Sequence, residues 1–209
     1  MGRWTVFLAG LLSVIVPRTA QANLTVSVGT LSLQAGGTGF VDVMVSGNGD
    51  PVDAFGFEFR IQPTGRTASW LQFANPQPLD YLTDPSYLLA GDSFDAGDPP
   101  VGNVITDILP LDTFLGGDLS ESDIDSVVTS SRLLARLEVT SDTLLRPSAG
   151  DTFSILLLPT SSSYFRDAAG DPIAFTSSAG TVTITPEPGT LCLLAAGAVA
   201  LLVRRRLRR

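Results

Sequence analysis

The chain has 209 residues, of which 44% are hydrophobic, and its formal net charge at pH 7 is −8. The sequence contains no histidine and no lysine, and Cys192 is its single cysteine. These absences exclude a Ser-His-Asp triad, a P-loop or Schiff-base lysine, an intramolecular disulfide and an ordinary Cys/His zinc site. The length suits one domain, since domains usually span roughly 100–200 residues.

Residues 1–22 predict a secretory signal peptide. Arg3 supplies the positive start, and residues 4–16 form an uninterrupted apolar run. Ala20 and Ala22 provide the pair of small residues that signal peptidase recognises, so we expect cleavage directly after Ala22. The alternative is an amphipathic first helix of a cytosolic protein, but this run is apolar on all faces. The segment therefore indicates export.

Residues 23–185 form the segment expected to be exported, and they are acidic. They hold 20 acidic residues and six arginines, so their net charge is 6 − 20 = −14. A field of this sign excludes nucleic acid and anionic lipid as partners, and it favours divalent cations or neutral polymers. Aspartate outnumbers glutamate 17 to four over the whole chain, which is typical of a protein rich in turns.

Hydrophobic residues in this segment recur with a period of two. Between residues 54 and 61, phenylalanine and isoleucine alternate with small or charged residues, which predicts a half-buried strand with its aromatic rings inward. Residues 120–131 have helix-capping residue types and are expected to hold at most one short helical turn. The predicted strands are Leu24–Val28, Phe40–Ser46, Phe55–Ile61, Trp70–Phe73, Asn103–Leu109, Arg132–Thr140, Thr152–Leu158 and Gly180–Thr185. Eight or nine strands without disulfides predict an all-β fold, a jelly-roll-type β-sandwich.

The order of these strands and turns resembles that of the cohesins, jelly-roll sandwiches related to carbohydrate-binding modules. The resemblance covers about residues 24–185. It is carried by the turn Val28-Gly29-Thr30, the aromatic strand Phe55-Gly56-Phe57-Glu58-Phe59, the strand Leu133–Thr140, the turn Gly150-Asp151 and the close from Phe165 to Ile184. It implies a cohesin-like domain over residues 23–185, although the chain contains no dockerin-like repeat.

The densest group of carboxylates is the loop that contains Asp92, Asp95 and Asp98. Calcium takes six to eight oxygen ligands, and spaced aspartates with backbone carbonyls can supply them. These three residues are therefore a candidate calcium site, and Ca²⁺ is the one cofactor we consider. The alternative is an ordinary solvated turn rich in aspartate.

Several aromatic residues could bind sugars if their rings are exposed, because an aromatic face stacks on a pyranose ring. The candidates are Trp70, Tyr81 and Tyr87, together with Tyr164. For Trp70, burial in the core is the favoured alternative, since Leu71 and a phenylalanine flank it. Paired carboxylates could also serve a glycosidase, but acidic loops are too common to identify such a pair.

The C-terminal segment, residues 186–209, has three parts. Pro186, Glu187 and Pro188 are followed by an apolar stretch over residues 190–203, and an arginine-rich tail over residues 204–209 closes the chain. Thirteen continuous apolar residues span only about 20 Å, less than the ~30 Å hydrocarbon core of a bilayer. Arginines on the cytoplasmic side can snorkel and extend such a span, so we expect a short transmembrane helix.

This ordered trio resembles the PEP-CTERM sorting signal of bacteria that produce exopolysaccharide. The resemblance implies that the three motif residues are recognised by an exosortase, a membrane protease that is expected to cut near them. It further implies membrane anchoring through the C-terminal helix before processing, followed by delivery to the cell envelope or extracellular matrix. The alternative is an ordinary short C-terminal anchor.

Together these features predict a surface or matrix protein with a non-enzymatic β-sandwich that acts structurally or adhesively. Signal peptidase and an exosortase are its expected processing partners. Two other functions remain open: a carbohydrate-binding module associated with exopolysaccharide, and a glycoside hydrolase.

Overall fold

The computed structural model describes residues 24–65, 70–94, 102–105, 112–142 and 146–186, with only the backbone for residues 102–105. Across these ranges the chain forms fourteen strands and one short 3-10 helix, η1. In chain order the elements are β1 (Leu24–Val28), β2 (Thr30–Gln34), β3 (Thr38–Ser46), β4 (Asp50–Val52), β5 (Ala54–Pro63), β6 (Gln72–Phe73), η1 (Asp80–Thr83), β7 (Gly102–Ile105), β8 (Thr113–Leu119), β9 (Ser126–Val128), β10 (Arg132–Thr140), β11 (Thr152–Leu157), β12 (Tyr164–Arg166), β13 (Phe175–Ser178) and β14 (Gly180–Thr185).

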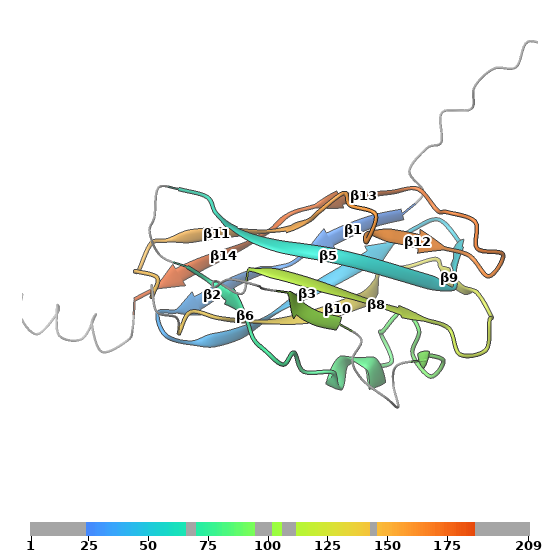
Figure 1. The fold of residues 1–209 in the computed structure, drawn as a ribbon, viewed down its shortest axis with the longest axis horizontal. Coiled ribbons are helices and arrows are strands. Elements are labelled where there is room, and N and C mark those ends of the chain that lie inside the picture. The colour runs from blue at the N-terminus through green and yellow to red at the C-terminus, as the bar shows by residue number, and fades with distance from the viewer. Residues whose placement is uncertain (1–23, 66–69, 95–101, 106–111, 143–145, 187–209) are drawn as a thin grey trace, which may run out of the picture.

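One layer of the sandwich is a five-stranded sheet in the order β13-β1-β3-β10-β6 (Figure 1). Strand β3 pairs antiparallel with both β1 and β10, whereas β13 runs parallel to β1. On β3 the side chains of Val41, Val43 and Val45 are buried, and those of Phe40 and Asp42 lie on the opposite face. This alternation follows from the strand geometry, and it gives the sheet one apolar and one largely polar face.

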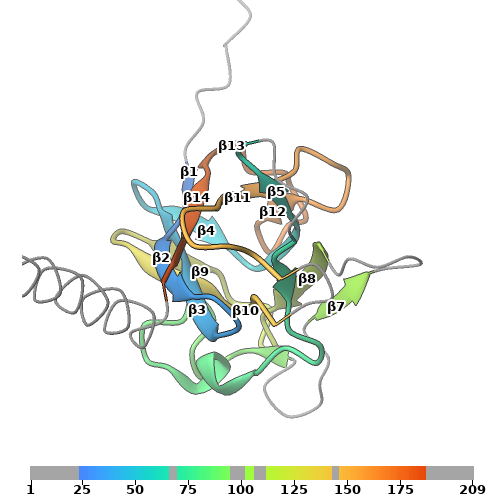
Figure 2. The ribbon, with the colours of Figure 1, turned by 90° about the vertical axis from the view of Figure 1, so that its left-hand side faces the viewer.

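The second layer is a seven-stranded sheet in which β2-β14-β11-β5-β8-β7 are neighbours and β12 also pairs with β5. Its centre is β5, where Phe55, Phe57, Phe59 and Ile61 are all buried. The end-on view shows both sheets curving around a shared interior, with β7 at the outer edge beside β8 (Figure 2). A small two-stranded sheet, β4-β9, completes the strand pairing in the described residues.

The core lies between the two sheets and is rich in phenylalanine. The ring centroids of Phe57 and Phe59 are 5.1 Å apart, and those of Phe57 and Phe114 are 5.8 Å apart. Phe73 extends the cluster from the opposite sheet, with its centroid 5.9 Å from that of Phe114. Each buried ring stabilises the fold by about 1.5–3 kcal/mol of transfer free energy, so these aromatic contacts join the two layers.

The segment from β6 to Phe94 runs along the outside of the sandwich beside β10 (Figure 1). It begins with β6 paired to the end of β10, continues through η1, and returns to β10 where Tyr87 forms a bridge with Leu133. At its far end, Ser93 forms a bridge with Ser120 at the end of β8. The segment is therefore attached to both sheets, and it forms one wall of the site described below.

The predicted all-β sandwich is confirmed, and the predicted strand Arg132–Thr140 is β10. Strands β2, β4, β8, β9, β12 and β13 were not predicted. Residues 120–131, where at most one short helical turn was expected, form no helical turn: Ser126–Val128 is a strand, and the helix of the described part is η1. The described residues include no helix with the length and apolar character to cross a bilayer. The predicted signal peptide and transmembrane helix both lie outside the described residues.

Candidate functional site: a pocket beside strand β10

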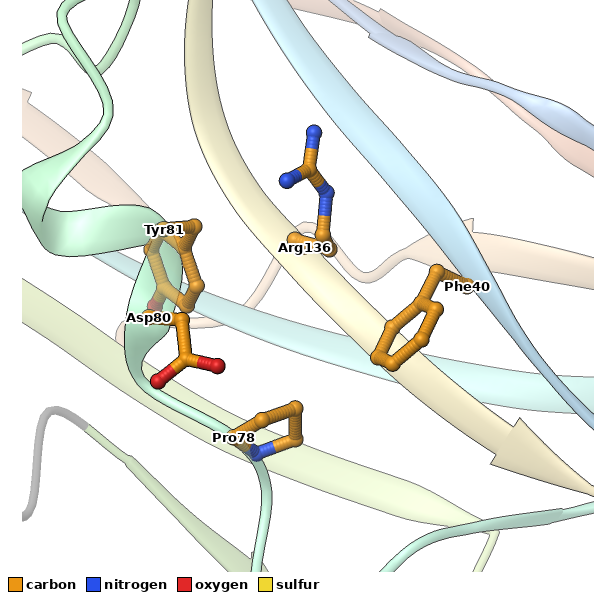
Figure 3. Close-up of a pocket in the computed structure, with 5 residues that line it drawn as sticks. All are labelled: Phe40, Pro78, Asp80, Tyr81 and Arg136. Carbon is orange, nitrogen blue, oxygen red and sulfur yellow. The ribbon is translucent and has the colours of Figure 1, made fainter.

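A surface pocket of about 310 Å³ lies where β3 and β10 face the segment that leads into η1. Its lining residues are Phe40 from β3, Arg136 from β10, and Pro78, Asp80 and Tyr81 from the segment (Figure 3). Three stretches of chain that are far apart in the sequence thus build one site. The alternation of β3 and β10 places Phe40 and Arg136 on the outer face of the five-stranded sheet.

The wall formed by residues 78–81 is held against β10 by the side chain of Gln77. Its Nε2 atom donates hydrogen bonds to the carbonyl oxygens of Ala74 at 2.7 Å and Glu138 at 2.8 Å. Its Oε1 atom accepts a third hydrogen bond, of 2.7 Å, from the backbone N–H of Glu138. The Gln77 amide thereby bonds to the backbone of β10 at the residue next to the last pair formed between β10 and β6. This arrangement fixes the distance between the wall and the sheet.

Arg136 is fixed by two carboxylates. Its Nε atom lies 2.6 Å from Oδ1 of Asp42 and its Nη2 atom 3.2 Å from Oδ2, a bidentate pair, and its Nη1 atom lies 3.9 Å from a carboxylate oxygen of Asp84. The hydrogen bonds that Arg136 donates to Asp42 raise the pKa of Arg136 above its ordinary value. Hydrogen bonds from the backbone and side chain of Ser86 lower the pKa of Asp84, and Arg136 adds to this effect. These shifts favour the charged forms of both Arg136 and Asp84.

The chemistry of the pocket is that of a binding site. Phe40 is 50% exposed and offers an open aromatic ring, while the exposed Asp80 offers a carboxylate. Figure 3 shows the Phe40 ring and the Asp80 carboxylate on opposite sides of Arg136, whose guanidinium points away from both. A guest in the pocket would consequently meet an aromatic face, an acidic group and the aliphatic stem of Arg136.

Two of the aromatic residues proposed to stack on sugars are buried in the structure. Tyr87 is 0% exposed and Tyr81 is 4% exposed, and their rings pack edge to face with centroids 5.5 Å apart. Neither ring has a free face for a sugar, so that expectation is corrected for both. Trp70 is half-buried, and its role in sugar binding stays a prediction. Phe40 was missed, although its place on the polar face of the predicted strand 40–46 was a usable signal.

Only part of the candidate calcium loop can be placed. Asp95 and Asp98 lie outside the described residues. The carboxylate of Asp92 accepts hydrogen bonds from the hydroxyls of Ser120 at 2.6 Å and Ser122 at 2.7 Å, and from the Ser122 N–H at 3.1 Å. These bonds lower the pKa of Asp92. Within the described ranges, no group of three or more His, Cys, Asp or Glu side chains could hold a metal ion.

A second acidic group lies at the same end of the sandwich. Asp53 follows β4, and its Oδ1 atom is buried without a hydrogen-bond partner. Burial raises the pKa of Asp53, and the nearby carboxylates of Asp123, Asp125 and Asp92 raise it further. The fold thus brings together like charges from three separate loops, which opposes the ionisation of Asp53.

The predicted processing residues lie almost entirely outside the described part of the chain. Ala20, Ala22, Glu187 and Pro188 all fall there. Pro186 is described, and it is exposed directly after β14. The last strand of the sandwich therefore ends where the predicted sorting motif begins.

Comparisons with known proteins find matches to the C-terminal segment and to the sandwich. The PEP-CTERM protein-sorting motif matches residues 185–209. This match implies that the chain is exported, anchored through its C-terminus and then processed by an exosortase. No curated protein matches the chain.

Solved structures resemble the sandwich itself. The sixth cohesin of scaffoldin B from Acetivibrio cellulolyticus, solved with a Cel5 dockerin, gives a TM-score of 0.54 at 12% identity and covers 78% of this chain and 99% of its own. The OlpC cohesin from Clostridium thermocellum, solved with Doc435, gives a TM-score of 0.51 at 15% identity and covers 81% and 97%. At such identities the likeness shows the fold, which is that of a cohesin-like β-sandwich.

Proposed function

We propose that this chain is a surface or matrix protein processed by an exosortase, and that its β-sandwich is structural or adhesive and does not catalyse a reaction. The PEP-CTERM match over residues 185–209 carries the proposal. Its position supports it further, because the sandwich ends at Thr185 and Pro186 is already exposed. A membrane protease could therefore reach the motif without unfolding the domain.

The adhesive role is supported by the fold and the composition. Cohesins of this fold were solved with dockerins bound, so in those proteins the sandwich serves protein binding. The sequence of this chain has no histidine or lysine to act as a general base or amine nucleophile. We therefore propose that this domain also works through its surface, by holding a partner.

Processing can be tested on the mature C-terminus. The full chain is expressed in an exosortase-containing bacterium, and the protein from the cell envelope and medium is analysed by mass spectrometry. We expect the mature form to lack residues 204–209, and we expect a Glu187→Gln variant to keep them. A Thr181→Ala variant, changed at an exposed residue of β14, is the matched control and should be processed normally. Mature wild-type protein that is intact through Arg209 would contradict the proposal.

Carbohydrate binding is the second candidate, and the position of Tyr164 favours it. This ring is 37% exposed on β12, and it lies over Gly56 on the outer face of the seven-stranded sheet. The Arg166 guanidinium lies 5.1 Å from its centroid. If the sheet binds exopolysaccharide, affinity electrophoresis should show retention that Tyr164→Ala abolishes and Tyr164→Phe preserves. Equal mobility of all three proteins, with and without polysaccharide, would exclude this function at Tyr164.

A further inference from the structure

We propose that the pocket beside β10 binds a cationic side chain, the guanidinium of an arginine or the ammonium of a lysine, presented by a protein partner. The inference rests on the proposed adhesive function, and it names the chemistry of the partner. It concerns the five-stranded sheet, on the opposite side of the sandwich from Tyr164. The argument depends on the charge, shape and rigidity of the pocket.

The charge of the pocket is negative after its internal ion pairs are counted. Among the described lining residues Arg136 is the one cation, and its guanidinium forms ion pairs with Asp42 and Asp84. Asp80 adds a third carboxylate. Within the described residues, this carboxylate forms no hydrogen bond or ion pair. Three carboxylates and one guanidinium give a local charge of about −2. The surrounding segment of charge −14 has the same sign and would attract a cation further.

The shape of the pocket suits a side chain with an apolar stem and a charged end. Phe40 and Pro78 provide apolar walls, and Asp80 lies beside Pro78 (Figure 3). A guanidinium or ammonium over the ring of Phe40 would gain a cation–π interaction, while its charge meets the carboxylate of Asp80. The stem of an arginine or lysine would then cover Pro78 and the stem of Arg136.

The pocket is also preorganised, so a guest would not have to order it. The Gln77 amide fixes the wall with three hydrogen bonds to the backbone, and the bidentate contact with Asp42 fixes Arg136. The cost of ordering side chains on binding is correspondingly small. An anionic guest would be repelled by the local charge. A neutral sugar or amide would gain no binding energy from the negative charge. The test therefore compares a cationic probe with a neutral one.

The probe is N-acetyl-arginine amide, and its neutral isostere N-acetyl-citrulline amide is the control. The full chain, labelled with nitrogen-15 in detergent micelles, is titrated and followed by amide NMR. We expect saturable shifts at Phe40, Asp80 and Arg136, with citrulline binding at least about fivefold more weakly. Asp80→Asn and Phe40→Leu should each weaken the arginine probe by about the same factor. Glu121→Gln, an equal loss of charge at an exposed site elsewhere, should leave its affinity unchanged.

Three results would overturn the proposal: equal affinity for citrulline and arginine, an Asp80→Asn variant no weaker than Glu121→Gln, or methyl glucoside causing the pocket shifts when the arginine probe does not. Unchanged amide spectra away from the pocket show that each variant is folded. The C-terminal mass analysis is independent of these titrations. Failure of the pocket to bind cations is therefore distinguishable from failure of the sorting proposal.

Discussion

Replacing Asp118 with alanine should destabilise the sandwich more than any other single loss of a carboxylate in its described part. Asp118 lies on β8 opposite Phe55, faces the interior and is only 5% exposed. Its Oδ2 atom accepts hydrogen bonds from the hydroxyls of Tyr87 and Ser93, and its Oδ1 atom accepts one from the N–H of Leu119. This carboxylate attaches the segment beside β10 to the seven-stranded sheet.

The magnitude follows from the partners that the substitution leaves behind. A hydrogen bond to a charged group contributes about 1.5–3 kcal/mol, and a buried donor without a partner costs about 1–3 kcal/mol. Asp118→Ala leaves two buried hydroxyls without their acceptor, so we expect a loss of about 3–5 kcal/mol in the free energy of unfolding. Asp118→Asn keeps one oxygen, and the hydroxyls can rotate to accept from its amide. Its cost should be only about 1–2 kcal/mol.

The assay is urea denaturation of residues 23–185, which contain every buried core residue of the described structure. The urea dependence of the free energy should stay constant, since the surface exposed on unfolding does not change. Asp142→Ala, at an exposed carboxylate, is the control and should stay within about 0.5 kcal/mol of the wild type. In a double-mutant cycle, Tyr87→Phe should cost much less once Asp118 is alanine. Additive costs, or a loss below about 1 kcal/mol for Asp118→Ala, would refute the reasoning.

Three further substitutions test other parts of the fold. Gly117→Ala should lower the free energy of unfolding by about 1–3 kcal/mol, because the new Cβ would lie 2.5 Å from the carbonyl oxygen of Phe55. Gly65→Ala, where the space around the new Cβ is open, is the control and should be nearly neutral in the same denaturation assay. Phe57→Ala should cost about 3–5 kcal/mol by removing a buried ring from the core, and a loss below 2 kcal/mol would contradict the packing. Asp53→Asn should stabilise the protein at pH 7 by up to about 1 kcal/mol. Because the folded-state pKa of Asp53 is raised, its favourable contribution is fully present below its unfolded pKa of about 3.9 and is lost as the pH rises through the higher folded-state pKa. The gain from Asp53→Asn should therefore vanish in denaturation curves at pH 3.

The strands that were predicted correctly carry apolar side chains along most of their length. Residues 132–140 carry apolar side chains at nearly every inward position, so β10 was found with its observed bounds. Strand β8 was missed because two of its three inward positions hold residues that rarely indicate a core. Phe114 is followed on that face by Gly116 and Asp118. Burial of Asp118 depends on hydrogen bonds from two hydroxyls of a distant segment, those of Tyr87 and Ser93. The sequence around Asp118 does not indicate these partners.

The candidate site was not predicted from the sequence, for a related reason. One of its residues, Tyr81, was proposed as a ligand-binding residue, but the pocket as a whole was not. The juxtaposition of the pocket residues depends on contacts between Gln77 and Glu138 and between Asp42 and Arg136, which are 61 and 94 residues apart. Such register is set by the packing of whole sheets. Sequence patterns predicted the face of β3 on which Phe40 lies, but not the wall that makes this exposed ring part of a pocket.

The arginines of the exported segment show why a cationic partner is the most natural one. Arg132 and Arg146 donate hydrogen bonds to the backbone carbonyls of Tyr87 and Ala35, so they attach loops to the sheets. Arg136 forms ion pairs with Asp42 and Asp84. In the described part of the chain these arginines act within the fold, whereas the carboxylates of Asp80, Asp123, Asp142 and Asp171 are exposed. A surface of this charge repels anions and attracts cations, and the pocket lined by both Phe40 and Asp80 is the place where it adds an aromatic face to the charge.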